Sequence, residues 1–376
     1  MTERERYRTR GLAFKWSSDY HACVKEFGDL ITRYTADTMA RNNLAGCLTY
    51  LREWPKAMDE MRQAIKILPK RALFRENLAL YAAYSSDFQT AEQTARAIED
   101  PGLFGVLPLA FAQVLQGQVP QATETYQSLA KIDQQGASYT ASGLGDLALY
   151  EGRFTDAERI LAQGAAADVA AKDPDRAAAK FAALGYARVM RGRKGPAIAA
   201  AQSALANTQA VKIRFLTARI FLEAGDTAKA RALVASLAAE PQAEPQAYGK
   251  IVDGEAALKS GDARQAIKTL LEANALFDTW MGHFDLGRAY LEDGQFLQAD
   301  SEIDRCIRRR GEVLALFLDE EPTYGYLPPV YYYQGRVREG LNNKKFAESY
   351  RSYLTIRAQS KEDPLLPEVR RRAAAK

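Results

Sequence analysis

The sequence predicts an all-α fold, a right-handed solenoid built from about ten helix–turn–helix repeats. Two observations predict it. A short string recurs along the 376-residue chain, in which a small residue is followed by a polar residue, often an aromatic residue, and then alanine. Each copy lies between two longer segments of helical pattern. The clearest copies are at 18–23, 86–91, 151–157, 224–230, 260–266 and 293–299.

The string resembles the turn of the tetratricopeptide repeat (TPR), a helix–turn–helix unit of 34 residues. Aligned on the turn, the repeats start near residues 4, 38, 72, 103, 138, 178, 211, 247, 280 and 328. The alanine-rich segment 162–206 predicts lengthened helices, because alanine has the highest helix propensity. The long interval before residue 328 predicts an ordered insertion at 308–330. We therefore expect one continuous array over 1–376, ending in a polar C-terminal cap at 356–376.

The small residues of the pattern stand where a helix ends at a turn and where the two helices of a repeat cross. Glycine at a turn ends a helix because it tolerates positive φ, and the aspartate that often follows can cap the next helix. Small residues paired across a repeat, such as Gly145 with Ala157 and Gly287 with Ala299, let two helices approach closely. The turn glycines are Gly117, Gly152, Gly192, Gly225, Gly261 and Gly294.

Composition indicates a soluble protein. Hydrophobic residues make up 47% of the chain and charged residues 26%, and no apolar run is long enough for a membrane helix or a signal peptide. The net charge of +4 is carried at the two chain ends, so no nucleic acid is expected as a partner. Three cysteines predict unpaired, buried small residues. We expect a cytoplasmic protein.

The chain carries no motif of a catalytic, nucleotide or metal site. We expect no enzyme activity, no cofactor and no metal. His283 occupies a slot that the repeat fills with a bulky residue, and His21 occupies an exposed one. The acidic run Asp319-Glu320-Glu321 has no partner at ligand spacing, which predicts a solvated loop.

In tetratricopeptide arrays the first helices of the pairs line a concave groove that binds extended or helical segments. Aromatic residues and arginine recur in the corresponding slots, and both types anchor interfaces. The resemblance therefore implies a protein- or peptide-binding scaffold. Of the five slots of a carboxylate clamp, only those of Arg8 and Asn43 hold a suitable residue, and Leu73 and Asn77 replace the two cations of the third repeat, so that specialisation is not expected. The predicted partner-binding residues are Phe104, Phe111, Tyr139, Tyr150, Tyr186, Phe215, Arg219, Tyr248, Phe284, Arg288, Tyr332 and Arg336.

The chain as a whole is similar to the tetratricopeptide region C-terminal to the catalytic domain of some bacterial eukaryotic-like serine/threonine kinases. The strings that carry this resemblance include TERERYRTRG at 2–11, EEPTYGYLPPVYYYQGRVREG at 320–340 and EDPLLPEVRRR at 362–372. It implies a sensory or recruiting role. It also opens an extracytoplasmic location, since a membrane helix often precedes such regions in those kinases.

Two other functions stay open from the sequence. Tyr324, Tyr326 and Tyr331 to Tyr333 cluster beside the insertion and could form a small-molecule or enzymatic pocket at 311–333. RNA binding by helical repeats is the weaker alternative, because the body of the chain is close to neutral.

Overall fold

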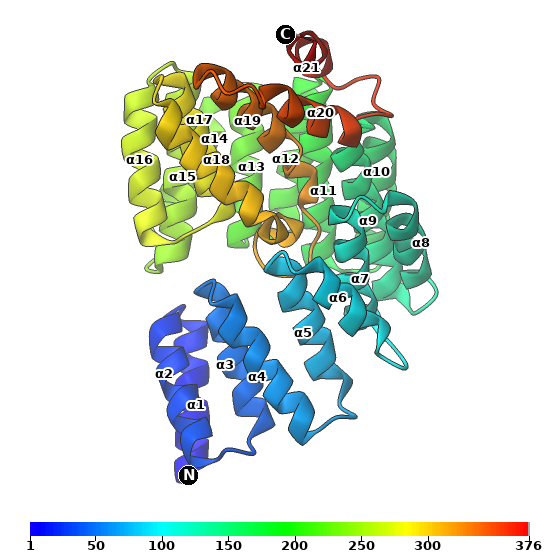
Figure 1. Cartoon of the computed structure of the whole chain (residues 1–376), viewed down its shortest axis with the longest axis vertical. Helices are drawn as coiled ribbons and strands as arrows, with labels where there is room; N and C mark the ends of the chain where they lie inside the picture. The colour runs from blue at the N-terminus through cyan, green and yellow to red at the C-terminus, as the bar shows by residue number, and fades with distance from the viewer. Residues whose placement is uncertain (375–376) are drawn as a thin grey trace. The chain divides into compact units, whose positions relative to one another are not determined.

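A computed structural model describes residues 1–374, which are organised into helices and turns, with no β-strand among them. The chain folds as two compact units, Met1–Ile132 and a second unit that starts at Asp133. The sequence predicts one continuous array across this boundary. The same helix-pair pattern runs through both units (Figure 1).

Unit 1 contains four helix pairs. Their bounds are α1 (Glu3–Trp16), α2 (Tyr20–Arg33), α3 (Thr38–Tyr50), α4 (Trp54–Ile67), α5 (Ala72–Tyr84), α6 (Phe88–Arg96), α7 (Leu103–Leu115) and α8 (Val119–Leu129). We call the face formed by the first helices of these pairs, α1, α3, α5 and α7, the inner face of unit 1.

Unit 2 continues the pattern over six pairs and ends in a single helix. The helices of the first four pairs are α9 (Gln134–Glu151), α10 (Phe154–Ala170), α11 (Pro174–Met190), α12 (Lys194–Asn207), α13 (Val211–Ala224), α14 (Thr227–Ala238), α15 (Ala243–Lys259) and α16 (Ala263–Leu276). They are followed by α17 (Trp280–Glu292), α18 (Phe296–Arg308), the 3-10 helices η1 (Arg310–Ala315) and η2 (Tyr324–Tyr326), α19 (Pro329–Gly340), α20 (Phe346–Ile356) and α21 (Leu366–Ala373). The inner face of unit 2 is formed by α9, α11, α13, α15, α17 and α19.

The predicted repeat starts are confirmed. The first helix of each pair begins within a few residues of the expected position, at residues 3, 38, 72, 103, 134, 174, 211, 243, 280 and 329. The helices in and beside the alanine-rich segment are long, with 18 residues in α9 and 17 in α10 and α11. The chain is therefore an all-α solenoid of tetratricopeptide-type helix pairs.

The turn inside each pair has the expected chemistry. All six turn glycines adopt positive φ, for example 91° at Gly225. A side chain would be strained there, whereas glycine is not. In the first three pairs, Ser18, Arg52 and Ser86 adopt positive φ at the same place. Aspartates after several turns accept a hydrogen bond from the backbone N–H three residues on, at Asp19, Asp87, Asp226 and Asp262.

Glycine inside the helices permits the close crossings within a pair. A Cβ on Gly145 would lie 2.5 Å from Leu161 of α10, and one on Gly287 would lie 2.8 Å from Ile303 of α18. Both contacts lie one turn beyond the partner that the repeat pattern names, which was Ala157 or Ala299. The crossings are close because a leucine or isoleucine fills the space that glycine leaves.

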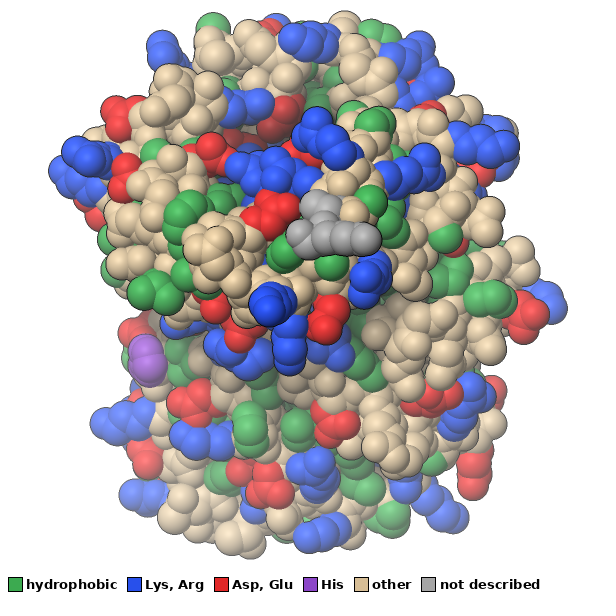
Figure 2. Space-filling model, turned by 45° about the horizontal axis from the view of Figure 1, so that its top comes forward, with side chains coloured by type: hydrophobic (Ala, Val, Ile, Leu, Met, Phe, Trp, Pro, Cys, Tyr) green, Lys and Arg blue, Asp and Glu red, His purple; other side chains and the backbone are tan. Residues whose placement is uncertain are grey.

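Two further features are the distribution of charge on the surface and the polarity of the helices. Basic and acidic side chains are interspersed over the visible face of the molecule (Figure 2). Within residues 1–374, the helices are all too short or too polar to cross a membrane.

Candidate functional site

The insertion between α18 and α19 lies on the inner face of unit 2. The Tyr324 hydroxyl donates to the carbonyl oxygen of Gly143 at 2.8 Å, and the Gly325 N–H donates to Asp146 Oδ2 at 3.0 Å. Both acceptors belong to α9, about half the chain away. The last part of the array therefore returns to the first helix of unit 2.

Aromatic rings hold the insertion in place. Tyr326 stacks on Tyr186 of α11 with ring centroids 4.5 Å apart. Phe317 lies 6.0 Å from Phe215 of α13 and 5.2 Å from Tyr248 of α15. Three of the residues expected to bind a partner are thus in contact with a segment of the chain itself.

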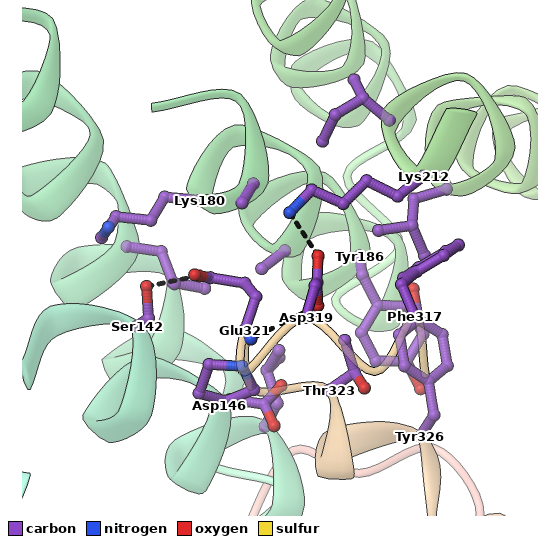
Figure 3. Close-up of a pocket in the computed structure, with 17 residues that line it drawn as sticks. Ser142, Asp146, Lys180, Tyr186, Lys212, Phe317, Asp319, Glu321, Thr323 and Tyr326 are labelled. Carbon is purple, nitrogen blue, oxygen red and sulfur yellow. Dashed lines mark hydrogen bonds and ion pairs between the residues drawn. The ribbon is translucent and has the colours of Figure 1, made fainter. Parts of the chain in front are cut away.

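The acidic run of the insertion is also docked. Lys212 Nζ donates to Asp319 Oδ2 at 2.5 Å, and Ser142 Oγ donates to Glu321 Oε1 at 2.6 Å (Figure 3). The expectation of a solvated loop is therefore wrong, because α9 and α13 supply partners that are distant in sequence. The space left beneath the insertion is about 30 Å³, room for a single water molecule.

Burial changes the acidity of the carboxyl groups around the insertion. It raises the pKa of Asp146 to about 7, although the backbone N–H of Gly325 opposes the shift. Burial, with repulsion from Asp319, also raises the pKa of Glu320 to about 7. The pKa values of one carboxyl group on α9 and one within the insertion thus lie close to neutral pH.

A second segment, between α20 and α21, fastens the C-terminal end of unit 2 to its first pair. Arg357 is fully buried, and its Nη1 donates to the carbonyl oxygen of Leu149 at 2.5 Å. Its Nε lies 3.2 Å from Asp363 Oδ2. Ser360 Oγ donates to the carbonyl oxygen of Gly152 at 2.7 Å. Unit 2 is therefore a closed arrangement in which both ends of the array meet.

An open cleft of about 300 Å³ remains on the inner face beside the insertion. Four first helices, α11, α13, α15 and α17, supply one side of it. The insertion, α19 and the segment before α21 supply the other. Its apolar and aromatic lining consists of Tyr186, Val189, Met190, Ile220, Met281, Phe284, Tyr326, Pro329, Tyr333, Pro364 and Leu365.

Four charged groups form the floor of this cleft, of which Arg219, Glu255 and Asp285 are buried and Arg288 is half-buried. Arg219 Nη1 lies 2.5 Å from Asp285 Oδ2 and 3.1 Å from Glu255 Oε2. Arg288 Nη1 lies 2.7 Å from Asp285 Oδ1, and the Arg288 guanidinium stands 5.4 Å from the centre of the Tyr333 ring. Two cations thus face two carboxylates, so the floor is polar while its formal charge is balanced.

The two carboxyl groups of this cluster shift in opposite directions. Burial raises the pKa of Glu255 to about 7 against the attraction of Arg219. Burial also acts to raise the pKa of Asp285, but attraction to Arg219 and Arg288 outweighs it and leaves that pKa lowered. The site thus has one firmly ionised carboxylate and one that exchanges its proton near neutral pH.

A second cleft of about 280 Å³ adjoins the first and shares Arg288 and Tyr333 with it. Lys259 and Glu292 line its outer part. Lys259 Nζ donates to Glu223 Oε2 at 2.8 Å. The two clefts together form a short groove across α13, α15 and α17.

The structure distributes the twelve predicted partner-binding residues over four places. Tyr186, Arg219, Phe284 and Arg288 line the open cleft. Tyr150, Phe215 and Tyr248 lie under the insertion with Tyr186, and Tyr139 is buried in α9 beneath the guanidinium of Arg176. Tyr332 donates to Glu368 of α21 and accepts from Arg336. In unit 1, Phe111 is fully buried against Tyr84 and Phe104 is 44% exposed.

Several lining residues were absent from the prediction. Met190, Met281 and Leu365 occupy slots where an apolar residue is unremarkable. Glu255 also lines the cleft, and here the sequence does carry a signal. A carboxylate is unusual among the apolar inner-face residues of α15. Among the five tyrosines of the alternative pocket, Tyr326 and Tyr333 line the cleft.

The histidines and cysteines have structural surroundings. His21 is exposed, as expected. His283 is buried between Asp278 and Glu302, at 3.0 Å and 2.6 Å, and these carboxylates raise its pKa against the effect of burial. Cys306 is buried and free. Within residues 1–374, no group of three or more potential ligands is arranged to hold a metal ion.

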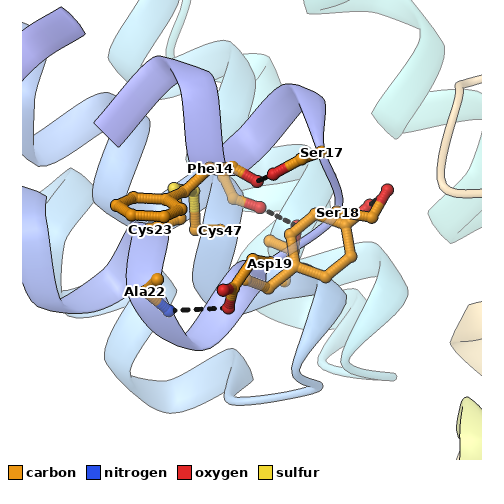
Figure 4. The surroundings of a disulfide bond; sticks show 10 residues. Phe14, Ser17, Ser18, Asp19, Ala22, Cys23 and Cys47 are labelled. Atoms are coloured by element: carbon orange, nitrogen blue, oxygen red, sulfur yellow. Dashed lines mark hydrogen bonds between the residues drawn. A yellow bond between two sulfur atoms is a disulfide. The ribbon is translucent and has the colours of Figure 1, made fainter. Parts of the chain in front are cut away.

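The expectation of unpaired cysteines is wrong for Cys23 and Cys47, which form a disulfide with a Cα–Cα distance of 6.2 Å. Figure 4 shows the bond where α2 and α3 meet. The two residues fill small-residue slots in neighbouring repeats, and such slots face each other when the repeats stack. A spacing of 24 residues gave no sign of this pairing in the linear sequence.

No protein-family model and no characterised sequence matches the chain. Several solved structures are similar to it. Human IFIT1 in a dimer with PPP-AAAA has 15% identity and a TM-score of 0.48, covering 93% of this chain and 84% of that one. Yeast Tom70 has 12% identity and a TM-score of 0.42, covering 95% and 76%. A tetratricopeptide repeat protein from Parabacteroides merdae has 12% identity and a TM-score of 0.41, covering 76% and 98%. Because these TM-scores lie below 0.5, the fold assignment rests on the helix pairs of the chain itself.

Proposed function

We propose that the chain is a non-catalytic scaffold that binds a protein or peptide segment in the cleft on the inner face of unit 2. The observation that carries the proposal is the cleft of about 300 Å³ lined by Tyr186, Arg219, Phe284 and Arg288. Aromatic residues and arginine dominate the energetics of protein interfaces. They converge here from three first helices, α11, α13 and α17.

The insertion shows how this face holds a polypeptide. Tyr326 stacks on Tyr186, and the main chain of Gly325 donates to a side chain of α9. A partner segment in the adjoining cleft would meet surfaces of the same kind. A single helical turn occupies roughly 400 Å³, from a diameter near 10 Å and a pitch of 5.4 Å. The cleft therefore suits an extended segment or one inserted side chain better than a helix.

The test is selection of peptides from a displayed random library with the full chain, followed by affinity measurements on two matched variants. Val189 lines the cleft as the second-last residue of α11, and Val169 is 50% exposed as the second-last residue of α10. Val189→Arg should weaken binding of the selected peptides at least tenfold. Val169→Arg should leave it unchanged. Equal binding by both variants would remove the cleft as the site.

A small molecule is the second candidate, because the volume of the cleft lies at the lower end of the range of ligand pockets. Tyr326 and Tyr333 in its wall favour a flat aromatic compound. Such a ligand should raise the thermal midpoint of the wild-type chain, and Tyr333→Ala should abolish the rise. If a compound library gives no ligand while selected peptides bind, the peptide proposal is favoured.

The resemblance to the tetratricopeptide region of bacterial serine/threonine kinases supports a partner from such a signalling system. Capture from source-cell lysate by the wild-type chain, but not by Val189→Arg, should enrich kinase activity in the eluate. Capture without kinase activity would leave the scaffold proposal and remove this partner.

The Cys23–Cys47 disulfide supports an extracytoplasmic location over a cytoplasmic one, because disulfides persist mainly in oxidising compartments. Alkylation of the two thiols in intact cells, detected by mass spectrometry, would contradict it.

A further inference from the structure

Lys15 places its ammonium group on the inner face of unit 1. From α1 the side chain reaches over α3, where its Nζ lies 3.3 Å from the point at which a Cβ on Gly46 would stand. The hydroxyl of Tyr81 in α5 is 4.0 Å from the same point. Lys15 is half-buried and, in the described chain, its ammonium group has no hydrogen bond or ion pair. Burial lowers its pKa, with no carboxylate to oppose the shift.

Glu76 is the opposite charge on the same face. It belongs to α5, and its Cγ lies 3.7 Å from the point at which a Cβ on Gly105 of α7 would stand. The residue is half-buried, and residues 1–374 give its carboxylate neither a hydrogen bond nor an ion pair. Burial raises its pKa.

Both side chains are therefore partly buried charges without a partner in unit 1. Moving a charge out of water without a partner costs free energy, and an uncharged residue would avoid that cost. Residues that reduce stability are retained where function needs them. A bound segment that carries a complementary charge at each position would satisfy both groups.

We infer that the inner face of unit 1 binds an extended peptide segment that carries an acidic residue against Lys15 and a basic residue against Glu76. This rests on the proposed function but places it on a second surface. The helix spacing sets the distance between the two charges. Lys15 on α1 and Glu76 on α5 are separated by two spacings between neighbouring inner-face helices, each about 9 Å. With the offset along the helix axes, the two charges lie about 20 Å apart. At 3.3 Å per residue this corresponds to about six residues.

Exposed apolar side chains lie close in sequence to Lys15 on α1 and to Gly105 on α7, the residue that Glu76 approaches. Leu12, one turn before Lys15 on α1, is 37% exposed. Phe104, which precedes Gly105 on α7, is 44% exposed. These two exposed side chains would give the segment apolar area to bury.

The test uses three blocked ten-residue peptides of alanine and serine with charged residues six positions apart, bearing glutamate and lysine, two glutamates, or two lysines. Titration calorimetry with the full chain should show the glutamate–lysine peptide binding about tenfold tighter than the other two. Lys15→Glu should transfer the preference to the two-lysine peptide, and Glu76→Lys to the two-glutamate peptide. Because each variant changes one site, these preferences do not depend on the direction of the bound peptide.

Lys25→Glu on α2 and Glu124→Lys on α8 are the matched controls, since both residues are exposed on second helices of unit 1. They should leave the wild-type preference unchanged. The same preference in Lys15→Glu and Glu76→Lys as in the wild type would overturn the inference, as would failure of all three peptides to bind. Continued binding of library-selected peptides in the unit 2 cleft would then show that the proposed function survives.

Stability provides an independent readout. Lys15→Met and Glu76→Gln should each raise the urea midpoint of the unit 1 helices, measured by hydrogen exchange. A lower midpoint in either variant would mean that the charge holds the fold, and would also overturn the inference.

Discussion

Arg357 donates from Nη1 to the carbonyl oxygen of Leu149 across 208 residues of sequence, at a distance of 2.5 Å. The bond joins the segment after α20 to the end of α9. Together with the docked insertion, it closes unit 2 and determines which part of the inner face stays open. The size of the cleft is therefore a consequence of closure.

Replacing Arg357 with methionine should destabilise unit 2 by about 3 kcal/mol, because it leaves the buried carboxylate of Asp363 without its cation. Arg351→Met, at an exposed position on α20, should change the stability by less than about 0.5 kcal/mol. Urea denaturation followed by circular dichroism measures both. Equal midpoints for the two variants would show that the closure contributes little.

Gly325→Ala should loosen the insertion. A Cβ there would lie 2.7 Å from Leu149 Cβ and 3.0 Å from Asp146 Oδ1, so the insertion must shift, at a cost of about 1–3 kcal/mol. Gly195→Ala in α12 is the control, because nothing lies within 4 Å of its Cβ position and alanine favours the helix. Hydrogen exchange over 311–328 should rise only in the first variant. Unchanged exchange in Gly325→Ala would contradict the docked position.

The starts of the first helices and the turn glycines were predictable because they depend on local rules. A glycine with positive φ ends a helix wherever it stands, and the repeat period locates the next helix. The docking of Asp319, Tyr324 and Arg357 was not predictable. Their partners Lys212, Gly143 and Leu149 are more than a hundred residues away, and nothing in the repeat pattern relates them.

The predicted groove residues show the same limit. Phe215, Tyr248 and Arg288 were recognised as inner-face residues from their slots. The slot gives the face, but it does not say whether the chain itself covers that face. The structure shows that Phe317 covers the rings of Phe215 and Tyr248, and this could not be read from their slots.

The stability of unit 2 should fall as the pH rises from about 4 to 7, because burial raises the pKa of Asp146 to about 7 in the folded state from near 4 in the unfolded state. The folded chain binds the proton more tightly, so each group of this kind lowers stability by at most about 1.4 kcal/mol per pH unit, and the loss ends above the folded pKa. Glu320 and Glu255, whose pKa values are also raised to about 7, act in the same direction.

Asp146→Asn isolates one of these groups, since an amide oxygen still accepts from the Gly325 N–H. The variant and the wild type should have similar free energies of unfolding at pH 5, and the variant should be more stable at pH 8. The groups that face Asp146 are Glu321, from the insertion, and the backbone of Tyr324 and Gly325. The same difference in stability at both pH values would contradict the raised pKa.

Reduction of the Cys23–Cys47 disulfide should destabilise the first helix pairs of unit 1 by roughly 3 kcal/mol, the entropic value for a loop of this size. Hydrogen exchange after treatment with dithiothreitol should increase in α2 and α3 and stay constant in α9 to α18. Cys306→Ala, which removes the buried free thiol, controls for effects of the reductant on that residue. If hydrogen exchange in α2 and α3 is the same before and after reduction, the disulfide contributes little to the stability of unit 1.

The most direct test of the binding site is a methyl NMR titration of the methionines with a library-selected peptide. Met190 and Met281 line the cleft, whereas Met58 and Met61 are buried in α4 of unit 1. A peptide bound in the cleft should shift the methyl resonances of Met190 and Met281 and leave those of Met58 and Met61 in place. Binding at the same affinity with Met190 and Met281 unmoved would contradict the account.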